Sequence, residues 1–500
     1  MLKQQKIFFD FLRFCIGSAK EIPDSLKEAD WKELYAIAKK QCLVGVLFDG
    51  IKKLPAEHVG MKKEILLQWM AESQMLEKAN VRLNDAVIQV SEWFRKKGFR
   101  TCILKGQGNA LMYPNPYSRT PGDIDIWVDG GDKRVISFVR SISPHEKACY
   151  HHIEFPSYKG VEVEVHYRPS FLLCFCHNRK LQKYYERGKE QQFSHRVMFG
   201  EQGEVAIPTA EFNLIFQLTH IFSHLMNEGI GLRQLVDYYY VLCDFYKVYQ
   251  KSSKITPSLF FDKASCTRQF ESELSLHSLA SLFPLKEGST SHPDPLTLRG
   301  EGGNRPTRCC ICPTCPSPAG GSLTHSQALA LSKRARDVTA PSRYSEPLRS
   351  KDGGPSKVSP DCAGWDRLSI EGDNSAGSTT AVTSSASTAL DVVQKELKEL
   401  GLWKFAGGIL YIMQEVFGMP ASRLIVPPNE KYGKFVLNEV LEAGNFGRHD
   451  ARNRFGRSQL GHNLQRVYRD IRLVRYFPAE ALCEPIFRTW HFFWRLKYKK

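Results

Sequence analysis

The sequence predicts an α+β fold in which a core with a mixed sheet is flanked by N- and C-terminal helical segments and interrupted by a long disordered insert. Three observations predict this class. Apolar residues recur at helix spacing over residues 62–97 and 209–249. Short apolar runs at 123–128 and 161–167, between these helices, are typical of strands. A stretch rich in Ser, Thr, Gly and Pro then separates the second helical region from a third.

The N-terminal region reads as helical up to about residue 98. Trp69, Val87 and Phe94 belong to the apolar stripe of a long helix, and Gly98 is expected to cap its C-terminus. After residue 98 the sequence pattern changes and predicts short strands, Gly- and Pro-rich loops and one helix. The elements expected in the core are strands at 99–104 and 123–128, a helix at 132–142, strands at 151–155 and 161–167, and a hairpin formed by 196–199 and 205–207.

Helical patterns return from Thr209, a good N-cap candidate, and again from about residue 391, with a break expected at Pro478. The roughly 140 residues between them far exceed an ordinary loop, so we interpret them as an insert within one helical domain. The predicted division is an N-terminal helical region (1–98), a core (99–208), a helical domain in two parts (209–250 and 391–500) and the insert (251–390).

The amino-acid composition narrows the classes of protein to which this chain can belong. The 500 residues are 42% hydrophobic, enough for a sizeable core, and carry a formal net charge of +16, which favours anionic partners such as nucleotides, nucleic acid or an acidic membrane. No run approaches the ~18 apolar residues of a spanning helix, and no secretory signal is visible. The 14 scattered cysteines fit free thiols in a reducing compartment, so we expect a cytoplasmic protein.

The strongest chemical signal is the pair Asp123 and Asp125. Residues two apart in a strand point to the same face, so Ile124 and Ile126 face the core while both carboxylates point to the other side. Neighbouring carboxylates repel each other and need protons or a cation to compensate. Mg²⁺ accepts such hard oxygen ligands, usually together with substrate phosphates.

A third carboxylate follows on the later strand Glu162-Val163-Glu164-Val165-His166, where Glu162, Glu164 and His166 share the polar face. If this strand lies beside the first one, Glu164 joins the aspartate pair, although Glu162 could take its place. Three converging carboxylates can hold two divalent metals for in-line nucleotidyl transfer. His166 could orient a carboxylate, and a structural hydrogen bond is the alternative.

The segment Lys105-Gly106-Gln107-Gly108-Asn109 follows a strand and opens a short helical stretch. Glycines let backbone N–H groups approach phosphate, and a helix N-terminus favours anions. We therefore expect Lys105, Gly106 and Gln107 to bind the nucleotide, with Arg119 as a further phosphate contact.

The segments ILKGQGNALMYPNPYSRTPGDIDIWV and VEVEVHYRP together resemble the nucleotidyltransferase superfamily with the DNA polymerase β-type fold, and within it the uncharacterised nucleotidyltransferase family. The resemblance covers about residues 30–250 and 390–490. It implies a polymerase β-type core in which Asp123 and Asp125 bind metal, Glu164 is the third carboxylate and Gly106 lies in the phosphate loop. The chain departs from the superfamily where Gln107 follows Gly106 and where the third acid is Glu rather than Asp.

The expected reaction is therefore transfer of a nucleoside monophosphate from an NTP, such as ATP, to an acceptor hydroxyl, with Mg²⁺ or Mn²⁺ as cofactor. The acceptor could be a small molecule, a protein or a nucleic acid. Two alternatives stay open. One is an antitoxin-like protein adenylyltransferase that uses the same chemistry, and the other is a non-catalytic binding protein that keeps the fold.

Other motifs favour structural interpretations. His220 and His224 are four apart on an expected helix, but Ile221 stands where a zinc-protease motif needs Glu, which favours a packed pair. His151 and His152 abut a strand and should face opposite sides. The cysteines at 309–315 lack the second pair of a zinc site.

The later helices carry two further features. Arg233 and Asp237 are one turn apart and could pair. The basic, aromatic C-terminus, which includes Trp490, Phe492 and Phe493, could meet nucleic acid or a membrane, but an amphipathic helix with its aromatic residues packed inward is favoured.

Overall fold

A computed structural model describes residues 3–55, 60–199, 203–253, 381–452 and 459–498. Within these residues both the predicted mixed sheet and the predicted helical segments are present, so the α+β class is confirmed. No helix in the described ranges is both long enough and apolar enough to cross a lipid bilayer.

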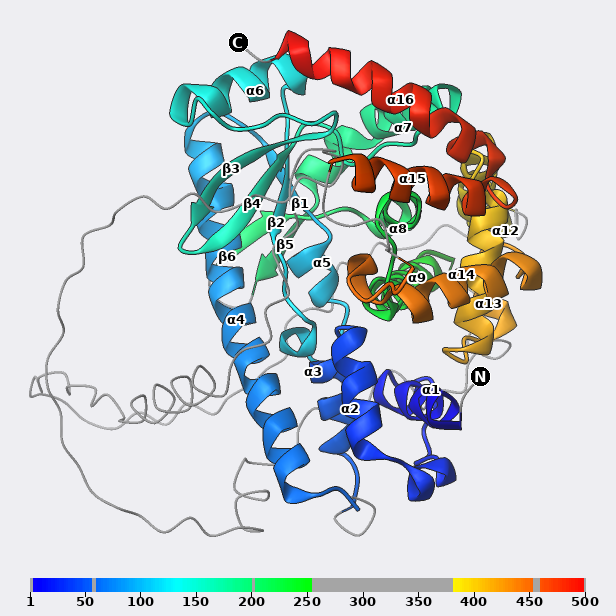
Figure 1. The fold of residues 1–500 in the computed structure, drawn as a ribbon. Helices are drawn as coiled ribbons and strands as arrows, with labels where there is room; N and C mark the ends of the chain where they lie inside the picture. Colours follow the sequence, from blue (N-terminus) through cyan, green and yellow to red (C-terminus); the bar gives the residue numbers. More distant parts are fainter. Residues whose placement is uncertain (1–2, 56–59, 200–202, 254–380, 453–458, 499–500) are drawn as a thin grey trace, which may run out of the picture. The chain divides into compact units, whose positions relative to one another are not determined.

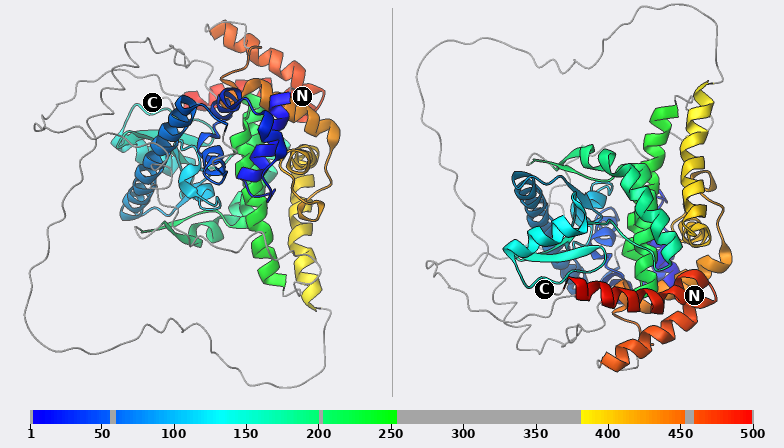
Figure 2. Two further views of the ribbon diagram at one scale, coloured as in Figure 1. Left: turned by 90° about the horizontal axis from the view of Figure 1, so that it is seen from below. Right: turned by 90° about the horizontal axis from the view of Figure 1, so that it is seen from above.

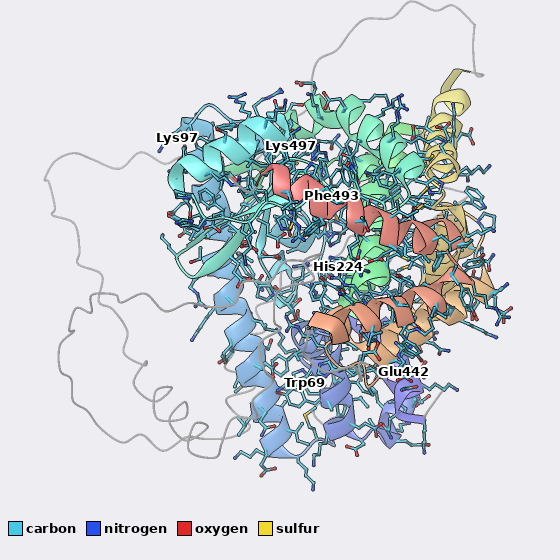
Figure 3. All side chains as sticks on the ribbon, turned by 45° about the horizontal axis from the view of Figure 1, so that its top comes forward. Trp69, Lys97, His224, Glu442, Phe493 and Lys497 are labelled. Atoms are coloured by element: carbon cyan, nitrogen blue, oxygen red, sulfur yellow. The ribbon has the colours of Figure 1, made fainter. Side chains whose placement is uncertain are left out.

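The N-terminal region is helical, as predicted. Its elements are α1 (Lys3–Cys15), η1 (Asp24–Glu28), α2 (Trp31–Lys40), α3 (Val44–Ile51) and the long α4 (Lys63–Lys96). The Asp30 side chain caps α2 by accepting the N–H groups of Lys32 and Glu33. Gly98, just past α4, has φ +80°, which confirms its predicted capping role. Trp69 and Lys97 lie near opposite ends of α4 (Figure 3), so this helix links the N-terminal helices to the sheet.

Four strands form the core sheet in the order β1-β2-β4-β3 (Figure 1). They are β1 (Thr101–Leu104), β2 (Ile124–Val128), β3 (His152–Tyr158) and β4 (Val161–His166). Strands β2 and β4 are parallel and the other pairs are antiparallel, which makes the sheet mixed. The connections contain α5 (Gly106–Ala110), η3 (Pro116–Ser118) and α6 (Gly131–Ile142), and a separate hairpin consists of β5 (Arg196–Phe199) and β6 (Gly203–Ala206).

The alternation predicted for β2 is present, but both faces of the strand are buried. Ile124, Ile126 and Val128 join a core cluster with residues of α4 and α6. On the opposite face, the Trp127 ring centroid lies 4.7 Å from that of Phe193. Asp125 shares this second face, so its carboxylate lies in an environment that excludes most water.

Helices α7 (Phe175–Ser194) and α8 (Ala210–Asn227) cover the second face of the sheet, and the described elements that follow α8 are also helices. They are α9 (Leu232–Ser253), α12 (Ala381–Glu399), α13 (Trp403–Glu415), η5 (Ala421–Arg423), α14 (Glu430–Ala443), η6 (Asn445–Gly447), α15 (Gln459–Val474) and α16 (Pro478–Lys497). Thr209 is the N-cap residue of α8, as predicted, although its side chain makes no capping hydrogen bond.

The helices on either side of the predicted insert pack together. Helix α12 contacts α8 and α9, and the views in Figure 2 show α9 and α12 side by side. Arg187 of α7 also lies 2.5 Å from Glu396 of α12. Helix α12 starts at Ala381, before the expected end of the insert at residue 390. Residues 254–380, which include the cysteines at 309–315, lie outside the described part of the chain.

The C-terminal helices break at Pro478, as predicted, since α16 begins there. The expectation that the aromatic residues pack inward is wrong for Phe492 and Phe493, which are 51% and 62% exposed. The inward stripe of α16 is formed by Phe487 and His491, and residues one or two positions later turn away from it. Figure 3 marks Phe493 on this helix.

The side chain of Glu154 in β3 has a buried environment that can be tested. One of its carboxylate oxygens is buried without a hydrogen-bond partner among the described residues. Burial, then the neighbouring Cys149, raises the pKa of Glu154 from 4.5 to about 7. The folded state therefore binds more protons than the unfolded state between these values, and stability falls as pH rises through this window.

We therefore expect Glu154→Gln to increase the free energy of unfolding at pH 8 by roughly 1–2 kcal/mol, after allowance for solvent that still reaches the carboxyl. At pH 4, where Glu154 is protonated in both states, the gain should vanish. Urea unfolding at the two pH values measures this difference. An equal effect at both would contradict the assigned environment.

Candidate active site

The pairing of β2 with β4 places two carboxylates side by side. Asp125 is the register partner of Glu164, and ligand atoms of Asp125, Glu164 and His166 all lie within 4.8 Å of one another. Glu162, the alternative third acid, is exposed at the start of β4. The structure therefore brings together two of the three predicted acids, with Glu164 rather than Glu162 beside Asp125.

Asp123 lies just before β2 and is half-buried. Burial, followed by the charges of Asp125 and Glu164, raises the pKa of Asp123 to about 6. This carboxylate is thus electrostatically coupled to the pair without belonging to the tight group around His166. A Cβ atom at Gly106 would lie 3.6 Å from the Asp123 carbonyl oxygen, so the glycine turn passes close to the first aspartate.

Cationic side chains compensate the carboxylates. The Lys105 Nζ lies 2.8 Å and the His166 Nε2 2.9 Å from Oδ1 of Asp125. The same His166 nitrogen is 3.5 Å from Oε2 of Glu164, and His152 Nδ1 is 3.3 Å from that oxygen. The repulsion inferred from the sequence is therefore relieved by a lysine and two histidines on the same face of the sheet.

The pKa values follow from these contacts. Burial alone would raise the pKa of Asp125, but Lys105 and His166 hold it below its usual range. Burial likewise opposes the lowered pKa of Glu164, which His152 and His166 produce. The two carboxylates in turn raise the pKa of His166 against the effect of burial, and Glu164 is the main cause that raises the pKa of His152 to about 10. The cluster is a set of mutually stabilised charges.

The turn after β1 places Lys105 over this cluster. Lys105 has φ +50° and ψ −136°, a conformation that costs a non-glycine residue of the order of 1–3 kcal/mol. Gly106, with φ +38°, follows and opens α5. The Gln107 side chain is directed elsewhere, because its amide nitrogen donates to Asn84 of α4. Of the expected nucleotide contacts, Lys105 and Gly106 lie at the carboxylates.

Arg119 has a different environment from the one expected for a phosphate contact. Its side chain is 3% exposed, and its Nε and Nη2 donate to the two Asp237 oxygens over 2.8 and 2.9 Å. The Tyr113 hydroxyl donates to the same carboxylate over 2.6 Å. Arg233, the expected partner of Asp237, instead donates to the Thr120 carbonyl. The planar guanidinium of Arg119 matches both carboxylate oxygens, which explains this choice.

The histidines were only partly anticipated. Ligand atoms of His151, His152 and His166 lie within 4.8 Å of one another, so the expectation that His151 and His152 diverge is wrong. Strand β3 begins at His152, and strand alternation therefore does not apply to His151. His220 and His224 pack edge to face at 4.3 Å and belong to none of the metal-capable groups among the described residues.

The donor set fits a divalent cation. Asp125 and Glu164 supply hard oxygen atoms, His166 supplies a nitrogen, and all three are close enough to contact one ion. Carboxylate oxygens of this kind suit Mg²⁺ or Mn²⁺.

Comparison with known proteins gives one family match. Residues 27–254 match the family model described as uncharacterised nucleotidyltransferase. No curated protein matches the chain. A solved structure of an antigenic nucleotidyltransferase-like protein from Paracoccidioides brasiliensis is 16% identical, covers 32% of this chain and 75% of its own, and has a TM-score of 0.22.

The buried Arg119–Asp237 pair predicts a loss of stability. Arg119→Ala leaves Asp237 buried without its charge partner, and we expect the free energy of unfolding to fall by about 3–5 kcal/mol. Arg100→Ala is a matched control, since Arg100 is half exposed and pairs with Asp129 at the surface. Its effect should stay below about 1 kcal/mol. Chemical denaturation compares the two, and similar small losses would show that Arg119 is not structural.

Proposed function

We propose, from the premise that residues 27–254 belong to the uncharacterised nucleotidyltransferase family, that this protein transfers a nucleoside monophosphate from an NTP to an acceptor hydroxyl and releases pyrophosphate. The family assignment supports nucleotidyl transfer in general. The observation that supports the finer proposal is the register pairing of Asp125 with Glu164, next to the Lys105-Gly106 turn.

In this proposal Asp123, Asp125 and Glu164 hold Mg²⁺ or Mn²⁺, and His166 either adds a nitrogen ligand or orients the two carboxylates. A divalent ion bound there would neutralise charge on the phosphates and lower the pKa of the acceptor hydroxyl. The raised pKa of Asp123 is consistent with an acid whose charge is only partly compensated by the protein alone.

Lys105 would exchange partners when substrate binds. Its ammonium group now neutralises Asp125, the same carboxylate that a metal ion would occupy. Once Asp125 binds a cation, Lys105 is free to contact the triphosphate as a point charge. Gly106 keeps the backbone of the turn free of a side chain, so that phosphate oxygens can approach its N–H groups.

Glu164 is the residue best placed to assist the acceptor. His152 and His166 fix its carboxylate, and its lowered pKa keeps it ionised. The acceptor oxygen would attack the α-phosphorus as the bond to the pyrophosphate oxygen breaks, and the acceptor proton would pass to Glu164 or to solvent. In this proposal His152 and His166 orient the Glu164 carboxylate, and Glu164 or solvent accepts the proton of the acceptor hydroxyl.

A non-catalytic binding protein that keeps the fold is the second candidate. It is favoured by the neutralisation of Asp125 through Lys105 and His166, which makes the cluster stable without any ion. Such a protein would bind a nucleotide through Lys105 without transferring any part of it.

The transfer assay separates these candidates. The chain is incubated with each α-labelled NTP, Mg²⁺ and a cell extract, and label on acceptors is measured. We expect Glu164→Gln to lower transfer on the order of 10²-fold or more. Glu162→Gln, on the same strand but exposed, should stay within about twofold. Equal transfer by the wild type and Glu164→Gln would remove the mechanism, and no transfer by any form would favour the binding protein.

Substitution of Lys105 should change the two binding steps in opposite directions. Lys105→Met removes the ammonium that competes for Asp125, so we expect Mn²⁺ to bind roughly tenfold more tightly. The same change removes a phosphate contact, so NTP affinity should fall by a similar factor. Titration calorimetry with Mn²⁺ alone and then with NTP measures both, and a parallel loss of both affinities would contradict the exchange.

A further inference from the structure

A second group of metal-binding side chains lies where the start of α16 meets the start of α7. Cys174 is the N-cap residue of α7, and His177 follows in the first turn. Glu480 and Cys483 occupy the first turns of α16. Helix α16 packs against α7 (Figure 1), so His177 and Glu480, 303 residues apart in sequence, face each other.

The distances fit one small cation. Ligand atoms of Cys174, His177 and Glu480 lie within 4.8 Å of one another, and His177 Nδ1 is 3.0 Å from Oε1 of Glu480. Atoms held at zinc bonding distances on the corners of a tetrahedron are roughly 3.3–3.8 Å apart. One ion can therefore reach all three with only small side-chain shifts.

The carboxylate of Glu480 is fixed by the protein. Its Oε2 accepts the backbone N–H groups of Leu173 over 2.6 Å and Cys174 over 2.9 Å, and only 4% of the residue is exposed. The hydrogen bonds on Oε2 leave Oε1 directed at His177. The His177 ring is itself packed against Gly401, where a Cβ atom would overlap it. Two of the donors are thus held in place before any ion binds.

Cys483 lies beside this group and can supply a fourth donor, but its thiol falls outside the set of atoms that lie within 4.8 Å of one another. Its thiol forms a hydrogen bond with that of Cys174, so a rotation of the Cys483 side chain would bring its sulfur to an ion held by the other three residues. The spacings Cys174-x-x-His177 and Glu480-x-x-Cys483 place each pair on one face of a helical turn. Two short motifs from distant parts of the chain therefore converge.

We infer that Cys174, His177, Glu480 and Cys483 form a structural zinc site that fastens α16 to α7. Two thiolates with an imidazole and a carboxylate select zinc over the hard cation expected at Asp125. With the Cys483 side chain turned toward the ion, four protein ligands would complete a tetrahedron and leave no open position for catalysis. On binding, each thiol exchanges its proton for the metal and the protons pass to solvent.

The test uses the full chain, purified with a reductant, dialysed against Zn²⁺ and assayed for bound metal. We expect one zinc per chain, and an affinity at least roughly 100-fold lower in Cys174→Ser and Cys483→Ser. Cys176→Ser is the matched control, because this exposed thiol lies between the ligands of α7 and should leave binding unchanged. Asp125→Asn should also retain zinc, which separates this site from the proposed transfer site.

Cobalt gives a readout that does not depend on how the variants fold. Wild-type chain loaded with Co²⁺ should show thiolate-to-metal charge-transfer absorption, which Zn²⁺ then displaces. The inference is overturned by absence of this absorption in the wild type, by equal zinc content in wild type and Cys174→Ser, or by loss of zinc in Cys176→Ser to the same degree.

Discussion

The mutual repulsion of buried carboxylates is the constraint on which the centre of this structure depends. Parallel pairing of β2 and β4 sets Asp125 directly beside Glu164, and Asp123 adds a third charge. Two like charges in a partly dry environment are tolerated only with compensation. Lys105, His152 and His166 provide this compensation. The cluster therefore depends on opposite charges around the acids as well as on close packing.

The sheet makes this arrangement possible because its two faces have different roles. One face is apolar and packs on α4 and α6, which fixes the positions of β2 and β4. The other carries the charged side chains and is covered by α7 and α8, which lowers the effective dielectric around them. A network of charges in such a place gains strength from every satisfied contact and loses it when one partner is removed.

Much of the acidic site could be predicted from local patterns. Strand alternation separates Ile124 and Ile126 from Asp125, and the same rule finds Glu164 on the polar face of β4. The rule does not say which strands are neighbours, and it left Glu162 as an alternative. The register of β2 and β4, which pairs Asp125 with Glu164, removes that alternative. It also failed for His151, which lies just outside β3.

Long-range partners could not be predicted. Arg119 and Asp237 are 118 residues apart, and their pairing depends on how α9 packs beneath the loop before β2. Cys174 and Glu480 are separated by most of the chain, including residues 254–380. Sequence spacing reveals each half of such a contact but not the meeting of the halves. In both cases tertiary packing decides which charge or donor a side chain meets.

Anomalous diffraction from crystals of the protein with Mn²⁺ and a non-hydrolysable NTP analogue would test the central claim most directly. We predict a manganese peak in contact with Asp125 and Glu164, and Lys105 moved from Asp125 to the phosphates. A nucleotide bound elsewhere, or an ion-free cluster in which Lys105 still contacts Asp125 at saturating Mn²⁺, would contradict the account.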